Sequence, residues 1–341
     1  MLCRLNQEAL TAIYGEGLVV LELPRKHVQG LSGVLKAFRG HIDGVNAVTI
    51  AAMIQRIKEA GAEQVFVDGS NLGGFVAILK RRLPAVEVIT FFHNVEARFF
   101  WGSLRAKSSL RACAVFVVNY LAERKAVRYS DKRLCLSERD SSLLARYYGR
   151  GATHVSPMAL EDKMPEAFRK QAALDANAFA LFVGGTFYAN REGITWFVRH
   201  VAPCIRTKIF IVGRGFEALR SQLAIPGKVE VIGPVNDLSD WYRRARFVIA
   251  PIFDGSGMKT KVAEALMYGK KLVGTPEAFS GYEGIAAQAG WVCRTADEFV
   301  EAVGAADASI TLSFDPSLRA LYEKAYSLAA AKARLQAILA G

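Results

Sequence analysis

The chain has 341 residues, of which 52% are hydrophobic and 22% are charged. This composition excludes a disordered chain, and the length is sufficient for two globular domains. The net charge is +12, and residues 1–160 hold most of it, with 22 basic and 13 acidic residues.

The five cysteines lie far apart in the sequence and form no CxxC pair or Cys/His cluster. We therefore expect free thiols in a reducing compartment and no metal site. No apolar run approaches the ~20 residues that cross a membrane, and the N-terminal segment lacks the apolar core of a signal peptide. These features favour a cytoplasmic protein.

The first half of the chain alternates between helix and strand patterns. Helices are predicted at residues 6–14, 73–83, 96–129 and 137–148, and strands at 18–23, 64–68, 86–92 and 133–136. Asp68 stands at the end of a strand, where we expect its carboxylate to cap the next helix. The segment 161–177 is polar and has no strand pattern, so we place a domain boundary near residue 160.

The same alternation restarts in the second half. Strands are predicted at 179–183, 209–212, 229–232, 247–253, 271–275 and 291–293, and helices at 191–205, 216–223, 238–245, 258–269, 296–305 and 316–339. Strands separated by helices imply parallel sheets with helices on both faces. We predict an α/β fold of two Rossmann-like domains that face each other across a cleft. They comprise residues 1–160, joined by the C-terminal helix 316–341, and residues 161–315.

Glycines follow four successive strands of the second half. They are Gly184 and Gly185, then Gly213 and Gly215, then Gly233, then Gly255 and Gly257. Each one alone is explained by a turn that needs backbone freedom. Together, at the carboxyl ends of parallel strands, they suggest a ligand site lined by backbone. Both interpretations stay open at this point.

Residues 247–275 combine an apolar strand, a glycine turn, a helix and a further strand. The free amides and positive dipole end of such a helix suit a diphosphate. Lys261 and Glu264 lie about 60° apart on one face of this helix. They form either an i,i+3 ion pair at the surface or a nucleotide site, with lysine on phosphate and glutamate on ribose.

The basic excess of the first half falls into three clusters. These are Lys80 to Arg82; Arg98, Arg105, Lys107 and Arg111; and Arg124, Lys125, Arg128, Lys132 and Arg133. Such clusters bind nucleic acid, an anionic membrane or an anionic substrate, or they form a solvated surface without a partner. No nucleic-acid-binding motif accompanies them, so we expect no nucleic-acid partner.

The second half resembles the group-1 glycosyltransferases of GT-B architecture. The resemblance rests on LFVGGTFYANREGITWF, KIFIVGRG, VEVIGPVNDLSDWYRRARFVIAPI and GSGMKTKVAEALMYGKKLVGT, in this order. It implies that Glu264 grips the ribose of a nucleotide-sugar donor and that Lys259 and Lys261 lie near its diphosphate. The remaining residues of the implied donor site are Ser256, Gly257, Gly184, Gly185 and Arg214.

The first half resembles the acceptor-side domain of the same family through VITFFHNVE, LCLSERDSSLLARYYG and RLNQEALTAIYG. This resemblance implies that His93 contacts the transferred sugar, although a histidine at a strand end is as often structural. Glu96 and Arg98 are candidates for acceptor contacts.

The chain also departs from the family pattern at three places. It begins at the family's first helix, so the preceding strand and glycine-rich loop are expected to be missing. Gly185 and Glu192 occupy positions where many members carry Arg and Lys, and Ser256 replaces a second glutamate.

The resemblance implies a hexosyltransferase-type enzyme that moves a sugar, with retention, from a nucleotide-diphosphate donor. Its acceptor would be a glycan or a polyprenyl-diphosphate-linked glycan in cell-surface polysaccharide synthesis. No Asp-x-Asp motif is present, so we expect metal-independent transfer without a cofactor. The basic first domain favours a peripheral position at the inner face of an anionic membrane. The alternatives are a non-catalytic nucleotide-sugar binding or assembly protein and, less favoured, a nucleotide-sugar epimerase.

Overall fold

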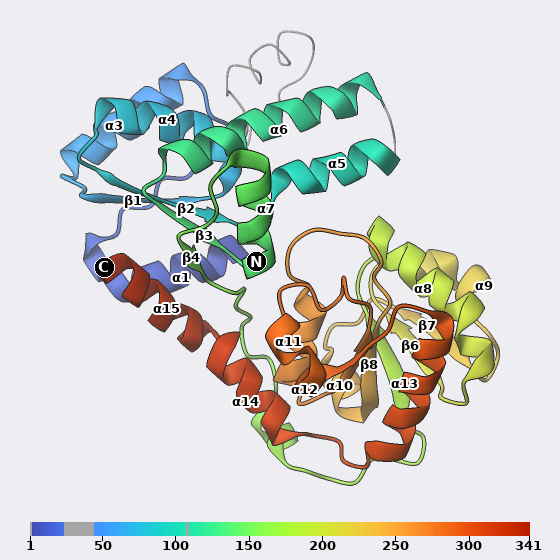
Figure 1. The fold of residues 1–341 in the computed structure, drawn as a ribbon. Coiled ribbons are helices and arrows are strands. Elements are labelled where there is room, and N and C mark those ends of the chain that lie inside the picture. Colours follow the sequence, from blue (N-terminus) through green and yellow to red (C-terminus); the bar gives the residue numbers. More distant parts are fainter. Residues whose placement is uncertain (1, 24–43, 107–108) are drawn as a thin grey trace. The chain divides into compact units, whose positions relative to one another are not determined.

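The structure is a computed structural model that describes residues 2–23, 44–106 and 109–341. The chain forms two compact units, Met1–Pro157 with Lys332–Gly341, and Met158–Ala331. We call them unit 1 and unit 2. Each is built on one parallel sheet with helices on both faces, as the alternating pattern predicted (Figure 1).

Unit 1 has a four-stranded sheet in the order β1-β2-β3-β4, and every pair is parallel. The strands are β1 (Gln64–Asp68), β2 (Glu87–Phe92), β3 (Lys132–Cys135) and β4 (His154–Val155). The helices are α1 (Leu2–Tyr14), α3 (Ala47–Glu59), α4 (Gly73–Arg82), α5 (Glu96–Ala106), α6 (Leu110–Tyr129) and α7 (Glu138–Tyr148).

One prediction for unit 1 is wrong, and one is refined. Residues 18–23 form no strand, and Val19, Val20 and Leu21 are exposed. A high β-propensity does not make a strand without a neighbour to pair with, and no described strand pairs with this segment. The helical region 96–129 is two helices, and Ser109 begins the second by accepting a hydrogen bond from the amide of Ala112. Helix α3 was not predicted, and Asn46 caps it.

Unit 2 has a six-stranded parallel sheet in the order β10-β9-β8-β5-β6-β7. The strands are β5 (Phe179–Val183), β6 (Ile209–Val212), β7 (Val229–Gly233), β8 (Ala245–Ala250), β9 (Leu272–Gly274) and β10 (Gly290–Val292). The helices are α8 (Tyr188–His200), α9 (Arg220–Leu223), α10 (Ser239–Arg244), α11 (Thr260–Met267), α12 (Ala286–Ala289), α13 (Ala296–Ser309) and α14 (Pro316–Ala325).

The C-terminal stretch was predicted as one helix that belongs with the first domain. It consists of α14 and α15 (Leu328–Ala340), and the division between the units falls at Lys332, within α15. Helix α14 belongs to unit 2, where the Arg319 guanidinium bonds the Met267 carbonyl oxygen at the end of α11.

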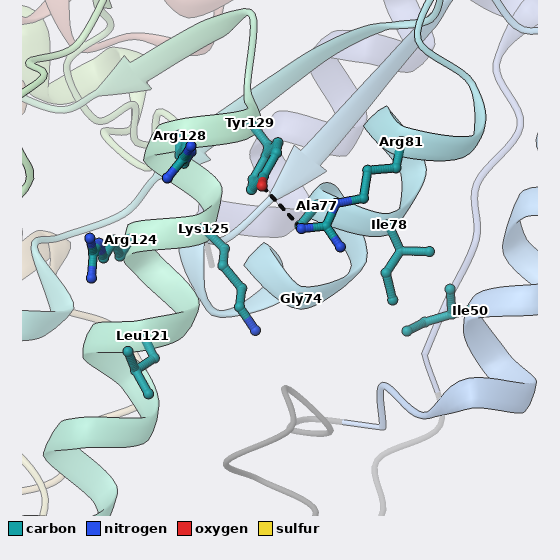
Figure 2. A pocket seen from close by; sticks show the side chains of 10 residues that line it. All are labelled: Ile50, Gly74, Ala77, Ile78, Arg81, Leu121, Arg124, Lys125, Arg128 and Tyr129. Atoms are coloured by element: carbon teal, nitrogen blue, oxygen red, sulfur yellow. Dashed lines mark hydrogen bonds between the residues drawn. The ribbon is translucent and has the colours of Figure 1, made fainter.

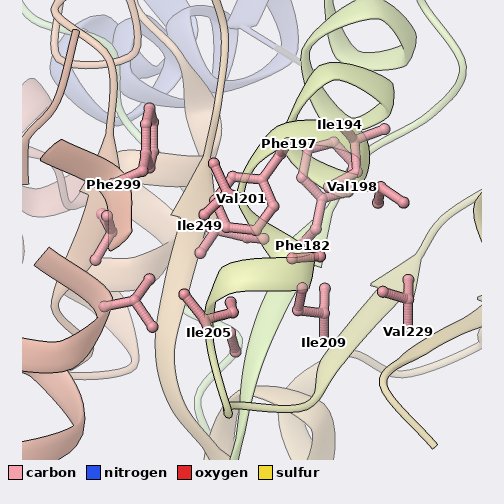
Figure 3. Packing of buried hydrophobic residues seen from close by; sticks show 14 of the residues in the cluster. Phe182, Ile194, Phe197, Val198, Val201, Ile205, Ile209, Val229, Ile249 and Phe299 are labelled. Atoms are coloured by element: carbon pink, nitrogen blue, oxygen red, sulfur yellow. The ribbon is translucent and has the colours of Figure 1, made fainter. Parts of the chain in front are cut away.

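The core of unit 2 is formed by large apolar side chains between the sheet and its helices (Figure 3). Phe182 on β5 and Ile249 on β8 are fully buried, as are Phe197 on α8 and Phe299 on α13. The rings of Phe197 and Phe299 meet edge to face at 5.5 Å. Truncation of one such phenylalanine to alanine typically costs about 3–5 kcal/mol, so this core holds the strand ends firmly in place.

The strand order of unit 2 reverses between β5 and β8. From β5 the chain adds β6 and β7 on one side, and then returns to place β8, β9 and β10 on the other side. In open parallel sheets the crevice beyond such a reversal is the usual ligand site. The loops that follow β5 and β8 are therefore where a ligand is expected.

Candidate functional site

The glycines that follow β5, β6 and β7 lie side by side. The Gly184 amide donates to the Val212 carbonyl oxygen at 3.0 Å, and the Gly213 amide donates to the Gly233 carbonyl oxygen at 2.7 Å. A Cβ atom on Gly213 would lie 1.8 Å from the Gly184 carbonyl oxygen. Backbone crowding therefore requires glycine at residue 213, and the edge that results is lined by backbone.

The turn between β8 and α11 is longer than predicted. The strand ends at Ala250 and the helix begins at Thr260, so the intervening residues form a loop beside the strand-order reversal. Gly257 adopts a left-handed φ of 64° in this loop. The Ser256 hydroxyl is buried there, and no described residue forms a hydrogen bond with it. A buried hydroxyl without a partner is costly, and a bound ligand oxygen would satisfy it.

Lys261 is buried, with 6% of its surface exposed. Its ammonium group donates to Asn190 Oδ1 at 2.8 Å and lies 4.5 Å from the centre of the Phe182 ring. Burial lowers the pKa of Lys261 to about 7. No ion pair joins Lys261 and Glu264 among the described residues, although their charges influence each other's pKa. A buried cation of this kind is destabilised until an anion joins it.

Glu264 follows one turn later on α11 and is half-buried. The Tyr242 hydroxyl donates to Glu264 Oε2 at 3.1 Å, and the Tyr242 ring stacks on Tyr268 at 4.4 Å. Burial raises the pKa of Glu264, and the Tyr242 hydrogen bond and the charge of Lys261 oppose this effect. One carboxylate oxygen is fixed by Tyr242, and the other has no partner among the described residues.

The Lys259 side chain lies against the loop between β8 and α11 and contacts its backbone. Its ammonium group lies 3.0 Å from Glu277 Oε1 and 2.8 Å from the Gly257 carbonyl oxygen. Arg214 lies on the loop after β6 with an exposed side chain, and its carbonyl oxygen accepts from the amide of Thr186. The predicted contacts of Lys259 and Arg214 with a diphosphate stay predictions.

Two residues of this site were missed by sequence reasoning. Asn190, which accepts a hydrogen bond from Lys261, lies in the first turn of the helix that follows Gly184 and Gly185. A polar residue at the start of a helix is common, so the sequence alone does not mark Asn190 as part of a site. Tyr242 lies on α10, and only the folded sheet brings it to Glu264.

In unit 1, His93 pairs with Asp68 at the carboxyl ends of β2 and β1. His93 Nε2 lies 2.7 Å from Asp68 Oδ1, which also accepts from Asn6 Nδ2 at 2.9 Å. Burial alone would raise the pKa of Asp68, but these hydrogen bonds outweigh it and lower the pKa. The predicted helix cap is wrong, because the carboxylate is turned toward His93 and no side chain caps the next helix.

The same place gathers three possible metal ligands. The Cys3 sulfur, an Asp68 oxygen and a His93 nitrogen lie within 4.8 Å of one another. No sequence pattern predicted this cluster, because the three residues are far apart along the chain. Thiolate, carboxylate and imidazole are ligand types that zinc accepts. The expectation of metal-independent transfer stays a prediction.

Glu96 and Arg98 lie in the first turn of α5, directly after His93 in the chain. A buried carboxylate, Glu123, fixes the start of this helix. It accepts from the amides of Glu96 and Ala97 at 3.0 and 3.1 Å, and from the Tyr148 hydroxyl at 2.7 Å. Burial raises the pKa of Glu123. The acceptor role of Glu96 and Arg98 stays a prediction.

Comparisons with known proteins identify a family for most of unit 2. Residues 178–306, from β5 to α13, match the family described as "Glycosyl transferases group 1". No curated protein sequence is significantly similar to the chain.

Several solved structures share the fold. A structure of WaaG, a glycosyltransferase involved in lipopolysaccharide biosynthesis, is 17% identical. The match covers 100% of this chain and 96% of that one, with a TM-score of 0.63. Sucrose-phosphate synthase from Thermosynechococcus elongatus is 15% identical over 86% of this chain and 77% of its own, with a TM-score of 0.64. Anabaena HepE in complex with UDP is 13% identical over 86% and 82%, with a TM-score of 0.65.

Proposed function

We propose that this chain is a glycosyltransferase of GT-B architecture and that it takes its sugar from a UDP-sugar. The choice of nucleotide is supported by the similar structures of HepE, which were determined with UDP and with UDP-glucose. We place the donor in unit 2, beyond the carboxyl ends of β5 and β8. The alternative that the sequence left open is a protein that binds the nucleotide sugar without transferring it.

One observation supports this proposal most strongly. Lys261 is buried and poorly stabilised as a cation. The Ser256 hydroxyl, which has no hydrogen-bond partner in the described part of the chain, lies in the loop that leads to the same helix. Breaking the sugar–diphosphate bond leaves negative charge on the departing diphosphate. A buried lysine and free helix amides are suited to stabilise that charge without reorganisation. Glu264, with one oxygen free, is suited to accept from the ribose hydroxyls.

For the transfer itself we propose retention of configuration without a metal ion. His93 would contact the transferred sugar, and Asp68 would fix the orientation of its ring through the 2.7 Å contact with Nε2. Glu96 and Arg98 would contact the acceptor.

We further propose a glycan or polyprenyl-diphosphate-linked acceptor in cell-surface polysaccharide synthesis, and a position at the inner face of the membrane. The excess of basic residues in the first half supports this location. No helix among the described residues has the length and apolar character needed to span a bilayer.

The donor site is tested by titrating the protein with UDP, and in parallel with GDP, by calorimetry. Glu264→Ala should weaken UDP binding by about 10- to 100-fold, because it removes charge-assisted hydrogen bonds to the ribose. Glu230→Ala, which removes an exposed carboxylate on β7, is the matched control and should bind like the wild type. An unchanged affinity of Glu264→Ala, or no binding of either nucleotide, would contradict the assignment.

Catalysis is tested separately by a donor screen in which mass spectrometry detects transfer to added acceptors. Transfer from a UDP-sugar supports the proposal. Tight UDP binding, combined with no release of UDP from any UDP-sugar, would favour the non-catalytic binding protein.

A further inference from the structure

Unit 1 carries a groove between α4 and α6 that the donor site does not involve (Figure 2). Its volume is roughly 500 Å³. Each helix contributes one stripe with i, i+3, i+4, i+7 spacing, so the groove follows the direction of both helices. The lining residues are Gly74, Ala77, Ile78 and Arg81 from α4; Leu121, Arg124, Lys125, Arg128 and Tyr129 from α6; and Ile50 from α3.

Four cations border this groove, and none of them pairs with a carboxylate among the described residues. Arg81 donates to the Tyr129 hydroxyl at 3.1 Å, and the guanidinium groups of Arg81 and Arg128 lie 5.4 and 5.8 Å from the Tyr129 ring centre. The pKa of Tyr129 is lowered by the Arg81 hydrogen bond and charge, and further by Arg128 and Lys125. The groove therefore has a positive potential.

Two basic residues next to the groove, unlike the four that border it, form ion pairs with carboxylates. Lys80 pairs with Asp131 at 2.7 Å, and Lys132 pairs with Glu87 at 3.0 Å. The carboxylates of this region thus neutralise lysines outside the groove. The four cations of the groove, by contrast, are not neutralised by a carboxylate among the described residues.

The helix dipoles explain only part of this arrangement. Arg81 and Arg128 lie in the last turns of α4 and α6, where a cation compensates the exposed carbonyl groups. Arg124 and Lys125 lie further from the end of α6 and face the same groove. Two cations therefore remain for which the dipole gives no reason.

The groove also has an apolar floor. Ile50, Ile78 and Leu121 line it beside the cations, together with the small residues Gly74 and Ala77 (Figure 2). A purely electrostatic anion site would not need aliphatic side chains. A ligand with an anionic head and an apolar substituent would contact both parts.

The Arg81 end of the groove is separate from the edge of the sheet that carries Asp68 and His93. Asp68 and His93 follow the carboxyl ends of β1 and β2. Arg81 and Tyr129 instead precede the amino ends of β2 and β3 in the chain. Because the strands are parallel, these two sets lie at opposite edges of the sheet. The Arg81 and Tyr129 end of the groove therefore lies away from Asp68 and His93.

We propose that this groove binds a phosphate ester with an apolar substituent. The phosphate lies among Arg81, Arg124, Lys125 and Arg128, and the apolar part lies on Ile50, Ile78 and Leu121. Two sources carry this chemistry, the headgroup of an anionic membrane lipid and a soluble phosphate ester. The site goes beyond the proposed sugar transfer and does not depend on it.

The probe is dihexanoyl phosphatidic acid below its micelle concentration, titrated by calorimetry into the full chain. Dihexanoyl phosphatidylcholine and inorganic phosphate serve as comparison ligands. The phosphatidic acid should bind more tightly than either, because only it satisfies both the cations and the apolar floor. Equal binding of inorganic phosphate would overturn the apolar half of the proposal, and no binding of phosphatidic acid would overturn it entirely.

The location is tested with Arg124→Gln/Arg128→Gln. The matched control is Arg56→Gln/Lys58→Gln, which removes the same charge from exposed residues of α3 in the same unit. The first variant should bind phosphatidic acid about 30-fold more weakly, and the control should be unchanged. Equal losses in both would show an effect of net charge and overturn the site.

Co-sedimentation with phosphatidylcholine vesicles that contain phosphatidic acid then separates the two sources. Retention by these vesicles, lost in Arg124→Gln/Arg128→Gln, identifies the membrane headgroup. Binding of the soluble lipid without retention identifies a soluble ester. UDP titration of the same variant should be unchanged, so that failure of the groove and failure of the donor site are distinguishable.

Discussion

Lys261 offers a direct test of the donor site, because a buried cation that waits for an anion should weaken the fold. Burial lowers the pKa of Lys261 from its usual 10.5 to about 7. This difference corresponds to roughly 5 kcal/mol against the charged form in the folded protein. Lys261→Met keeps a long apolar side chain in the same space and removes the charge. We therefore expect a more stable protein that has lost its function.

The difference in stability between Lys261→Met and the wild type should decrease as the pH rises. Between about pH 7 and 10.5 the unfolded chain holds the Lys261 proton and the folded chain does not, so the contribution of Lys261 to wild-type stability rises with pH. Below pH 7 Lys261 is protonated in both the folded and the unfolded chain, so the folded protein bears the full cost of burying the charge. The variant also loses the hydrogen bond to Asn190 and the contact with the Phe182 ring, about 1–2 kcal/mol each. We expect a net gain of about 2 kcal/mol at pH 6 that falls to near zero at pH 9.

Urea unfolding followed by tryptophan fluorescence is a suitable assay, because three of the four tryptophans lie in unit 2: Trp196, Trp241 and Trp291. Lys208→Met, at an exposed lysine of the same unit, is the control and should show no such pH dependence. Lys261→Met should also bind UDP at least tenfold more weakly. A variant that is less stable than wild type at pH 6, or a difference that is the same at pH 6 and pH 9, would refute the reasoning.

Three further substitutions test the surroundings of the two sites. Tyr242→Phe removes the hydroxyl that donates to Glu264 and should weaken UDP binding about three- to tenfold in calorimetry with little change in stability. Gly213→Ala places a Cβ 1.8 Å from the Gly184 carbonyl oxygen at a φ of 149°, and should cost at least roughly 3 kcal/mol in urea unfolding. Wild-type stability in that variant would show that the loops after β5 and β6 are not in contact. Glu123→Ala removes the acceptor of two amides and two hydroxyls and should cost roughly 3 kcal/mol. The matching loss of helix α5 should appear as faster amide exchange at its first turn.

The sequence by itself determined the two-unit α/β fold. Alternating strand and helix patterns specify parallel sheets because parallel strands need crossover connections. It also identified the turn and helix that carry Lys261 and Glu264, because local chain geometry fixes which side chains share a helical face. The prediction of a strand at residues 18–23 was wrong because a strand also needs another strand to pair with, which the local sequence does not show.

Only the tertiary structure decided what surrounds these residues. The strand order brings the loops after β5 and β8 together, and thereby sets Asn190 against Lys261 and Tyr242 against Glu264. Burial and the pKa values that follow from it depend on such long-range packing, and no local pattern encodes them. The pairing of Asp68 with His93 arises in the same way, because adjacent parallel strands place their last residues at one edge of the sheet.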